Sequence, residues 1–298
     1  MSLGVDLVPP KTCSYNCIYC ECGKTTLLTT ERREYVPTAE VTEELDSYLS
    51  ASPVLDFITF SGSGEPTLHS GVGEICRHIK GSFPGYKVAL LTNGSLFTEK
   101  SVRDEVMEMD VIVPSLDSAT DPGFMKIDRP CRTLDAGEIV SGLAELREEF
   151  SGEIWLEIFV VPGLNDTKEE ISALSAALKM IAPDRVQLNT LDRPGVVEWI
   201  RSATQEEMEK FKADLGYERT EITGRPSSRS GLGSFSGDAV ECIMQTISRR
   251  PCTIEDLSSV LDMHPNEVNK YIQLLLEEDR IKDTRGDRGI FFISAEED

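Results

Sequence analysis

The sequence predicts an α/β protein in two parts: a partial (β/α)6 TIM-like barrel over residues 1–222 and, after a linker at 223–237, a smaller domain over 238–298. Up to about residue 191, short apolar runs alternate with amphipathic stretches, and this alternation is typical of a parallel sheet that helices cover. The linker is indicated by TGRPSSRSGLGSFSG, whose Gly, Ser and Pro content is that of a flexible connection.

Six apolar runs are the predicted strands: SLGVDLV (2–8), DFITFSG (56–62), KVALLTN (87–93), DVIVPSLD (110–117), IWLEIFVV (154–161) and RVQLNTL (185–191). The amphipathic stretches at 38–51, 71–80, 99–109, 134–150 and 167–182 are the predicted helices between them. One more helix is expected over 204–216. A doubly wound open sheet is the alternative to the barrel, and in both folds the carboxyl ends of the strands face the site.

Residues 238–294 predict three helices, over 238–250, 253–262 and 265–279, and a hairpin over 281–294. Thr253 with Asp256, and Pro265 after His264, are signals of helix starts. This order resembles a winged helix-turn-helix domain. Residues 235–298 hold seven basic and fourteen acidic side chains, a balance of −7, whereas a DNA-reading domain carries a basic footprint. We therefore expect this domain to dock a substrate or a protein rather than a duplex.

The whole chain has 30 Lys and Arg against 52 Asp and Glu, a net charge of −22. Such a charge repels phosphate backbones and argues against nucleic-acid binding. The sequence has no run of 18 apolar residues, and its first residues lack the pattern of a signal peptide. These features predict no membrane partner and a cytoplasmic location, in which thiols stay reduced.

Four of the eight cysteines lie in KTCSYNCIYCECG, residues 11–23. A disulfide knot, a zinc site and an iron-sulfur cluster are the competing explanations. Disulfides are rare in a reducing compartment, and a structural zinc ion takes four ligands that usually come in two close pairs. Cys13, Cys17 and Cys20 are spaced C-x3-C-x2-C, which fits three irons of a 4Fe-4S cluster whose fourth iron stays open.

This spacing, with Tyr19 just before the last cysteine, is similar to the signature of the radical S-adenosylmethionine (radical SAM) superfamily. That superfamily carries a GGE-like motif after its second strand, and SGSGEP stands there in this chain, with Ser63 at the first glycine position. LTNGS (91–95) and the pair Ser115 and Asp117 also resemble its cofactor-binding strand ends. KIDRP (126–130) and VVPGLND (160–166) are similar to the activating-enzyme-like and wyosine-base-forming branch.

The resemblance implies a 4Fe-4S cluster held by Cys13, Cys17 and Cys20, with S-adenosylmethionine on the open iron. Tyr19 and the run Gly62, Ser63, Gly64 and Glu65 would then contact this cofactor, and glycine allows a close approach of the backbone. One electron from a donor such as flavodoxin or ferredoxin would cleave the cofactor to methionine and a 5′-deoxyadenosyl radical. The radical would take a hydrogen atom from a still unknown substrate, which is a small molecule, a peptide or protein, or a tRNA base.

Further polar residues at strand ends are expected to contribute. Asn93, Ser115 and Asp117 are expected to bind the cofactor, with turn and cap formation as the alternative role for each. Gln187 and Asn189 stand two residues apart on the last predicted strand, so both should point to one side as further contacts.

Glu157 interrupts the apolar run IWLEIFVV. An unpaired carboxylate is costly inside a sheet, so we expect Glu157 to face the barrel cavity as a catalytic residue, with internal pairing as the alternative.

Two cysteines near the expected site stay unassigned. Cys22 is either a thiol beside the substrate or a bystander, and Cys131 follows KIDRP closely enough to reach the cavity.

The sequence also supports a second hypothesis, in which the chain is an iron-sulfur redox-sensing regulatory protein. Such a protein would act through its winged-helix domain and would make no radical.

Overall fold

The computed structural model describes residues 2–223, 239–261 and 263–295. The chain divides into two compact units. The first is built from Met1–Ile18, Lys24–Thr190 and Ala203–Thr223. The second is built from Tyr19–Gly23, Leu191–Ser202 and Gly224–Asp298.

The first unit contains a parallel sheet, and the described residues supply seven strands to it. These are β1 (Ser2–Val5), β4 (Phe57–Phe60), β5 (Val88–Thr92), β6 (Val111–Pro114), β7 (Glu153–Phe159), β8 (Arg185–Asn189) and β9 (Thr220–Ile222). Neighbours in the sheet follow one another in chain order. A doubly wound sheet reverses its strand order, whereas a β/α barrel does not. The predicted α/β fold of the TIM-like type is therefore confirmed, and the doubly wound alternative is wrong.

Strand β9 was not predicted. It is three residues long, TEI, and pairs with β8 through Val186 and Thr220. Glu218 and Arg219 precede it and Glu221 is its central residue, so it lacks the apolar run by which the other strands were recognised. The number of strands expected from the sequence was one too low for this reason.

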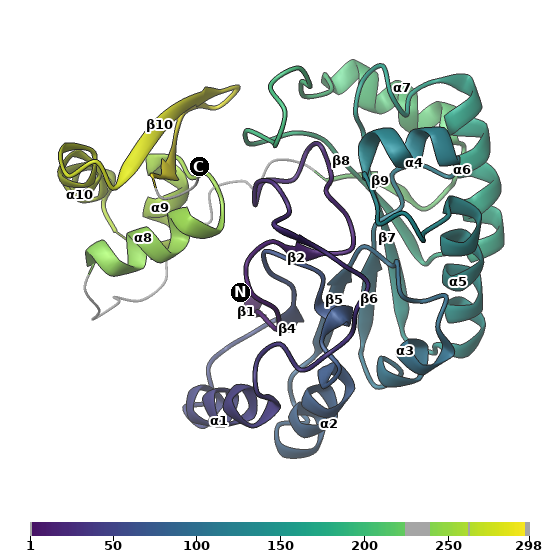
Figure 1. The fold of residues 1–298 in the computed structure, drawn as a ribbon, viewed down its shortest axis with the longest axis horizontal. Coiled ribbons are helices and arrows are strands. Elements are labelled where there is room, and N and C mark those ends of the chain that lie inside the picture. The colour runs from purple at the N-terminus through teal and green to yellow at the C-terminus, as the bar shows by residue number, and fades with distance from the viewer. Residues whose placement is uncertain (1, 224–238, 262, 296–298) are drawn as a thin grey trace. The chain divides into compact units, whose positions relative to one another are not determined.

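Helices lie along the outer side of the sheet (Figure 1). They are α1 (Thr38–Leu49), α2 (Val72–Ser82), α3 (Lys100–Glu105), α4 (Asp121–Ile127), α5 (Ala136–Glu149), α6 (Lys168–Ile181) and α7 (Gln205–Leu215). The sequence predicted each of these except α4, which begins where the Thr120 hydroxyl accepts from the Gly123 amide at 3.2 Å. Short strands β2 (Thr12–Cys13) and β3 (Leu27–Leu28) pair with each other before α1.

Alternation along the strands separates the apolar core from the inner face of the sheet. On β7, Ile154, Leu156 and Ile158 are fully buried, while Trp155 and Glu157 between them are half-buried. Successive side chains of a strand point to opposite faces, and the fully buried set packs in the main core with residues of the helices. Glu157 therefore lies on the inner face, away from that core.

The second unit contains α8 (Ala239–Arg249), α9 (Ile254–Leu261), α10 (Pro265–Glu277), β10 (Ile281–Gly286) and β11 (Gly289–Ser294). The last two form an antiparallel hairpin. These elements agree with the predicted helices and hairpin and have their own apolar core. The winged helix-turn-helix assignment and the domain boundaries stay predictions, and all of the expected linker 223–237 except Thr223 lies outside the described residues.

Among the described helices, none has both the length and the hydropathy of a segment that spans a bilayer.

Asn165 fixes the loop that follows β7. It is fully buried, and its side-chain amide donates to the backbone oxygens of Asp117 at 2.9 Å and Phe159 at 2.8 Å. Its side-chain oxygen accepts from the Val161 amide at 2.8 Å. The Asp117 carboxylate in turn accepts from the Phe159 amide at 2.6 Å. The carboxyl ends of β6 and β7 are thus held together by hydrogen bonds away from solvent.

We predict that Asn165→Ala lowers the free energy of unfolding by about 2–4 kcal/mol, because it leaves buried carbonyl and amide groups without partners. Urea unfolding followed by circular dichroism measures this change. The exposed Glu169→Gln on α6 is the control and should shift stability by less than about 0.5 kcal/mol. An equal effect of both variants would contradict this account of the loop.

Candidate functional site

Glu65 is the centre of the polar groups at the carboxyl ends of β4 and β5. Its side chain is 2% exposed. Within the described residues its carboxylate accepts from the Thr67 amide (3.0 Å) and hydroxyl (2.6 Å), the Thr92 hydroxyl (2.7 Å) and the Asn93 amide (2.7 Å). Burial raises the pKa of Glu65, and the hydrogen bonds from Thr67, Asn93 and Thr92 oppose that rise.

Asn93 connects Glu65 to the cysteine-bearing segment. Its side-chain amide donates to the Ser14 hydroxyl at 2.8 Å and lies 3.5 Å from Cys13 Sγ. Its side-chain oxygen accepts from the Ser95 amide at 3.0 Å, which fixes the orientation of the group. The residue that was predicted from LTNGS therefore contacts the first cysteine of the triad.

Cys13 lies at the end of β2 and is half-buried. Removal of water from its sulfur and the nearby charge of Glu65 raise the pKa of the thiol to about 12. Two donors, the Tyr15 amide and the Asn93 side chain, approach the sulfur at 3.5 Å. A sulfur that N–H donors approach suits a thiolate that gains a metal ion, since metal binding displaces the thiol proton. Cys13 therefore fits an iron-sulfur cluster.

The segment SGSGE packs directly on this strand. The Glu65 amide donates to the Thr12 carbonyl at 3.0 Å, and the Lys11 amide donates to the Ser63 carbonyl at 2.8 Å. A Cβ atom at Gly64 would stand 2.2 Å from the Thr12 oxygen, so glycine is required there for the chain's own packing. Gly62 has φ of 138°, and a Cβ there would meet Asp6 Oδ1 at 1.6 Å. These glycines are therefore required by the packing of the chain itself, and not only by the close approach of a ligand.

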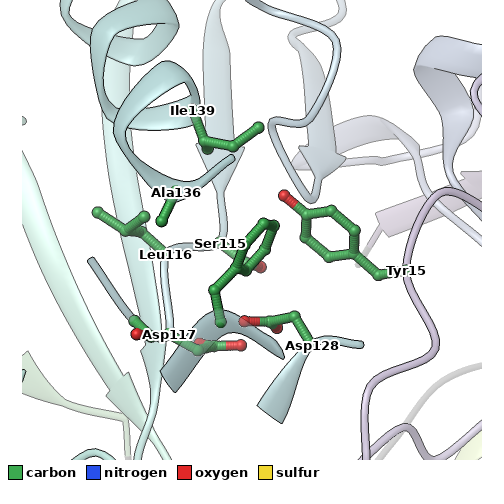
Figure 2. A pocket seen from close by; sticks show the side chains of 9 residues that line it. Tyr15, Ser115, Leu116, Asp117, Asp128, Ala136 and Ile139 are labelled. Atoms are coloured by element: carbon green, nitrogen blue, oxygen red, sulfur yellow. The ribbon is translucent and has the colours of Figure 1, made fainter. Parts of the chain in front are cut away.

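Cys17 lies beside a buried pair of carboxyl groups. Its thiol lies 3.5 Å from Asp128 Oδ1. The pKa of Asp128 is raised well above its usual range, first by burial and then by the charge of Asp117. Figure 2 shows both carboxyl groups at one side of a small cavity that Tyr15 and Ser115 also line. Asp128 belongs to KIDRP, and the motif alone predicted no role for this residue.

The remaining predicted site residues of the first unit do not all lie at the same place. Ser115 is half-buried beside the cavity, whereas Asp117 is 3% exposed and holds the Phe159 amide. Gln187 donates to Glu221 at 2.9 Å, and Asn189 contacts the Thr223 hydroxyl. Gln187 and Asn189 are half-buried at alternate positions of β8. Glu157 on β7 is also half-buried.

Cys20 belongs to the second unit, together with Tyr19 and Cys22, and all three are half-buried. The described residues contain no group of three or more His, Cys, Asp and Glu side chains arranged around a common metal position. Cys131 is also half-buried, and its amide donates to the Ser14 carbonyl at 2.9 Å. Sequence reasoning missed the supporting roles of Ser14, Thr92 and Asp128, which depend on long-range contacts that spacing does not reveal.

Comparisons with known proteins agree with the motifs. Residues 7–174 match the Radical SAM superfamily. The chain is 34% identical over 286 residues to a protein named GTPase Obg from Brachyspira hyodysenteriae, which covers 95% of this chain but 42% of that protein. It is 31% identical over 283 residues to a UPF0026 protein of Helicobacter pylori, covering 94% of this chain and 89% of that protein.

Solved structures are similar at the level of the fold. A radical SAM methyltransferase from Sphaerobacter thermophilus has a TM-score of 0.58 and 17% identity, over 74% of this chain and 65% of that one. The structure of TYW1 with a lysine-pyruvate adduct has a TM-score of 0.50 and 16% identity, over 68% and 69% of the two chains. From the match over residues 7–174, the cysteine spacing and the barrel, we conclude that the chain belongs to the radical SAM superfamily, in the family of the UPF0026 proteins.

Proposed function

We propose that this chain is an enzyme that cleaves S-adenosylmethionine reductively and uses the resulting radical to take a hydrogen atom from a substrate. One observation carries the proposal: Asn93 contacts Cys13 of the C-x3-C-x2-C triad and, through its amide, Glu65 of the SGSGE motif. When bound, a reduced 4Fe-4S cluster supplies the electron that cleaves the cofactor to methionine and a 5′-deoxyadenosyl radical.

The cysteines Cys13, Cys17 and Cys20 would hold the cluster. Asn93 would keep a donor on the Cys13 sulfur, which stabilises negative charge there. Buried Glu65 would fix the position of Asn93 by accepting hydrogen bonds from the Asn93 backbone amide and the Thr92 hydroxyl. Its carboxylate already accepts hydrogen bonds from the protein, so we assign it a positioning role rather than direct contact.

The cofactor contacts follow the same reasoning. Tyr19, the backbone of Gly62, Ser63 and Gly64, and Ser115 are proposed to border S-adenosylmethionine. Asp117 is proposed to hold these residues in place by accepting a hydrogen bond from the Phe159 amide.

The inner face of the sheet is proposed to receive the substrate. Gln187 and Asn189 would bind cofactor or substrate there, and Glu157, on the same face of β7, is the proposed catalytic residue.

The partners are part of the proposal. A reductant such as flavodoxin or ferredoxin would deliver the electron, in a cytoplasm that keeps thiols reduced. The net charge of −22 argues against a large polyanionic substrate, which favours a small molecule, peptide or protein over a tRNA base.

The decisive experiment is anaerobic reconstitution with iron and sulfide, followed by dithionite and S-adenosylmethionine. We expect about four irons per chain by the cluster assignment, and formation of 5′-deoxyadenosine and methionine, measured by liquid chromatography. A full cluster without 5′-deoxyadenosine would refute the enzyme and favour the redox-sensing regulator. A colourless protein that retains zinc instead would refute both.

Cysteine variants test the proposed ligand set. Cys13→Ala, Cys17→Ala and Cys20→Ala should each lose most of the iron, because a cluster with only two protein thiolates is released readily. Cys22→Ala is the matched control and should keep full iron content and cofactor cleavage. Loss of the cluster in Cys22→Ala would show that the three-plus-one division is wrong.

Asn93 variants test the donor on Cys13. We expect Asn93→Asp to make the reduction potential of the cluster more negative, since it replaces an N–H donor by a charge next to sulfur. A spectroelectrochemical titration measures this shift. Thr98→Ala, beyond the turn, is the control, and an unchanged potential in Asn93→Asp would contradict the assignment.

A further inference from the structure

Arg193 lies at the centre of a charge network within the second unit. Its guanidinium is 3.0 Å from Glu21 Oε2 and 3.5 Å from Asp256 Oδ2. The Arg193 side chain is 11% exposed, and those of Glu21 and Asp256 are 27% and 14% exposed. Charge pairs with so little solvent are weakly screened, and the loss of one member leaves its partner charge without compensation.

The network continues through Arg288 at the tip of the β10–β11 hairpin. Its guanidinium donates to both carboxylate oxygens of Asp256, at 2.9 and 3.0 Å, and its Nε lies 2.9 Å from Asp192. Arg193 and Arg288 therefore share Asp256 as a common partner. A planar guanidinium suits such multiple contacts better than a lysine ammonium.

Backbone packing supports the same connection. A Cβ atom at Gly195 would stand 3.0 Å from the Cα of Tyr19, so the segment Leu191–Ser202 closely approaches the residue before Cys20. A Cβ at Gly286 would stand 3.5 Å from Pro194 of that segment. The segment thus contacts Tyr19–Gly23 as well as the hairpin.

The Asp256 side chain also caps a helix, and this role can be tested separately from its contact with Arg193. Its carboxylate accepts from the Thr253 amide at 3.1 Å, and the Thr253 hydroxyl accepts from the Asp256 amide at 3.1 Å. This reciprocal pair caps the amino end of α9. Removing the Thr253 hydroxyl weakens the cap but keeps the charge of Asp256.

We propose that Arg193 is a positioning residue that holds the segment carrying Cys20 against α9, through Glu21 on one side and Asp256 on the other. The C-terminal helices and hairpin then determine how well ordered the third cluster cysteine is. The link to the cluster rests on the proposed function, whereas the contact between Arg193 and its two partners does not.

Amide hydrogen exchange of the full-length protein without cluster tests the contact itself. In Arg193→Met and in Asp256→Asn, amides of residues 19–23 should exchange roughly ten-fold faster than in the unaltered protein, because local opening costs less free energy. Thr253→Ala, which weakens only the cap, and Arg280→Ala, an exposed site after α10, are the controls. Unchanged exchange at 19–23 in both test variants, or an equal increase in Thr253→Ala, would overturn the proposal.

Iron release tests the consequence for the cluster. After reconstitution, a ferrous chelator should remove iron about five-fold faster from Arg193→Met, with Arg193→Lys intermediate, since lysine keeps the charge but not the forked geometry. The double variant Arg193→Met with Asp256→Asn should accelerate release by less than the product of the two single effects, because the two residues share one contact while each also has a partner of its own. Equal release rates in all variants would refute the role of Arg193. If the unaltered protein holds no cluster, the proposed function fails while the exchange experiment still decides the contact.

Discussion

The buried carboxylate of Glu65 is the constraint on which the candidate site depends. A carboxylate that is 2% exposed must have hydrogen-bond donors, and they come from the turn after β4 and from the end of β5. These donors fix the position of Asn93, whose side chain then contacts Ser14 and Cys13. Three segments that are far apart in the sequence are therefore ordered by one buried group.

The polar groups around Glu65 differ from the Cys13 sulfur in how their charge is balanced. The hydrogen bonds around Glu65 and Asn93 join protein groups to one another, so the chain itself supplies the partners of these buried groups. The Cys13 sulfur is the exception, because its raised pKa disfavours the thiolate until a cation arrives. In the proposed enzyme, a cluster bound by Cys13 would balance the negative charge of this sulfur.

The cysteine motif and the polar strand ends could be recognised because their residues are close together in the sequence. Of the seven strands that the described residues supply to the parallel sheet, six carry clear apolar runs and were predicted from them. Strand β9 escaped because three residues between charges leave no periodic signal. The environment of Asp128 escaped for another reason. Its burial and its proximity to Cys17 and Asp117 depend on tertiary contacts over more than ten residues, which spacing does not encode. Sequence patterns therefore predict candidate ligands more readily than the buried residues that surround them.

The sheet ends in β1 on one side and β9 on the other, so each presents one unpaired edge within the described residues. Unpaired edges invite strands of other chains and lead to aggregation. Here β1 is four residues long, and β9 has three residues with the exposed Glu221 at its centre. Short strands and a charged side chain disfavour intermolecular pairing. The short length and the charged residue that prevented the prediction of β9 therefore also disfavour pairing between the sheet edges of two chains.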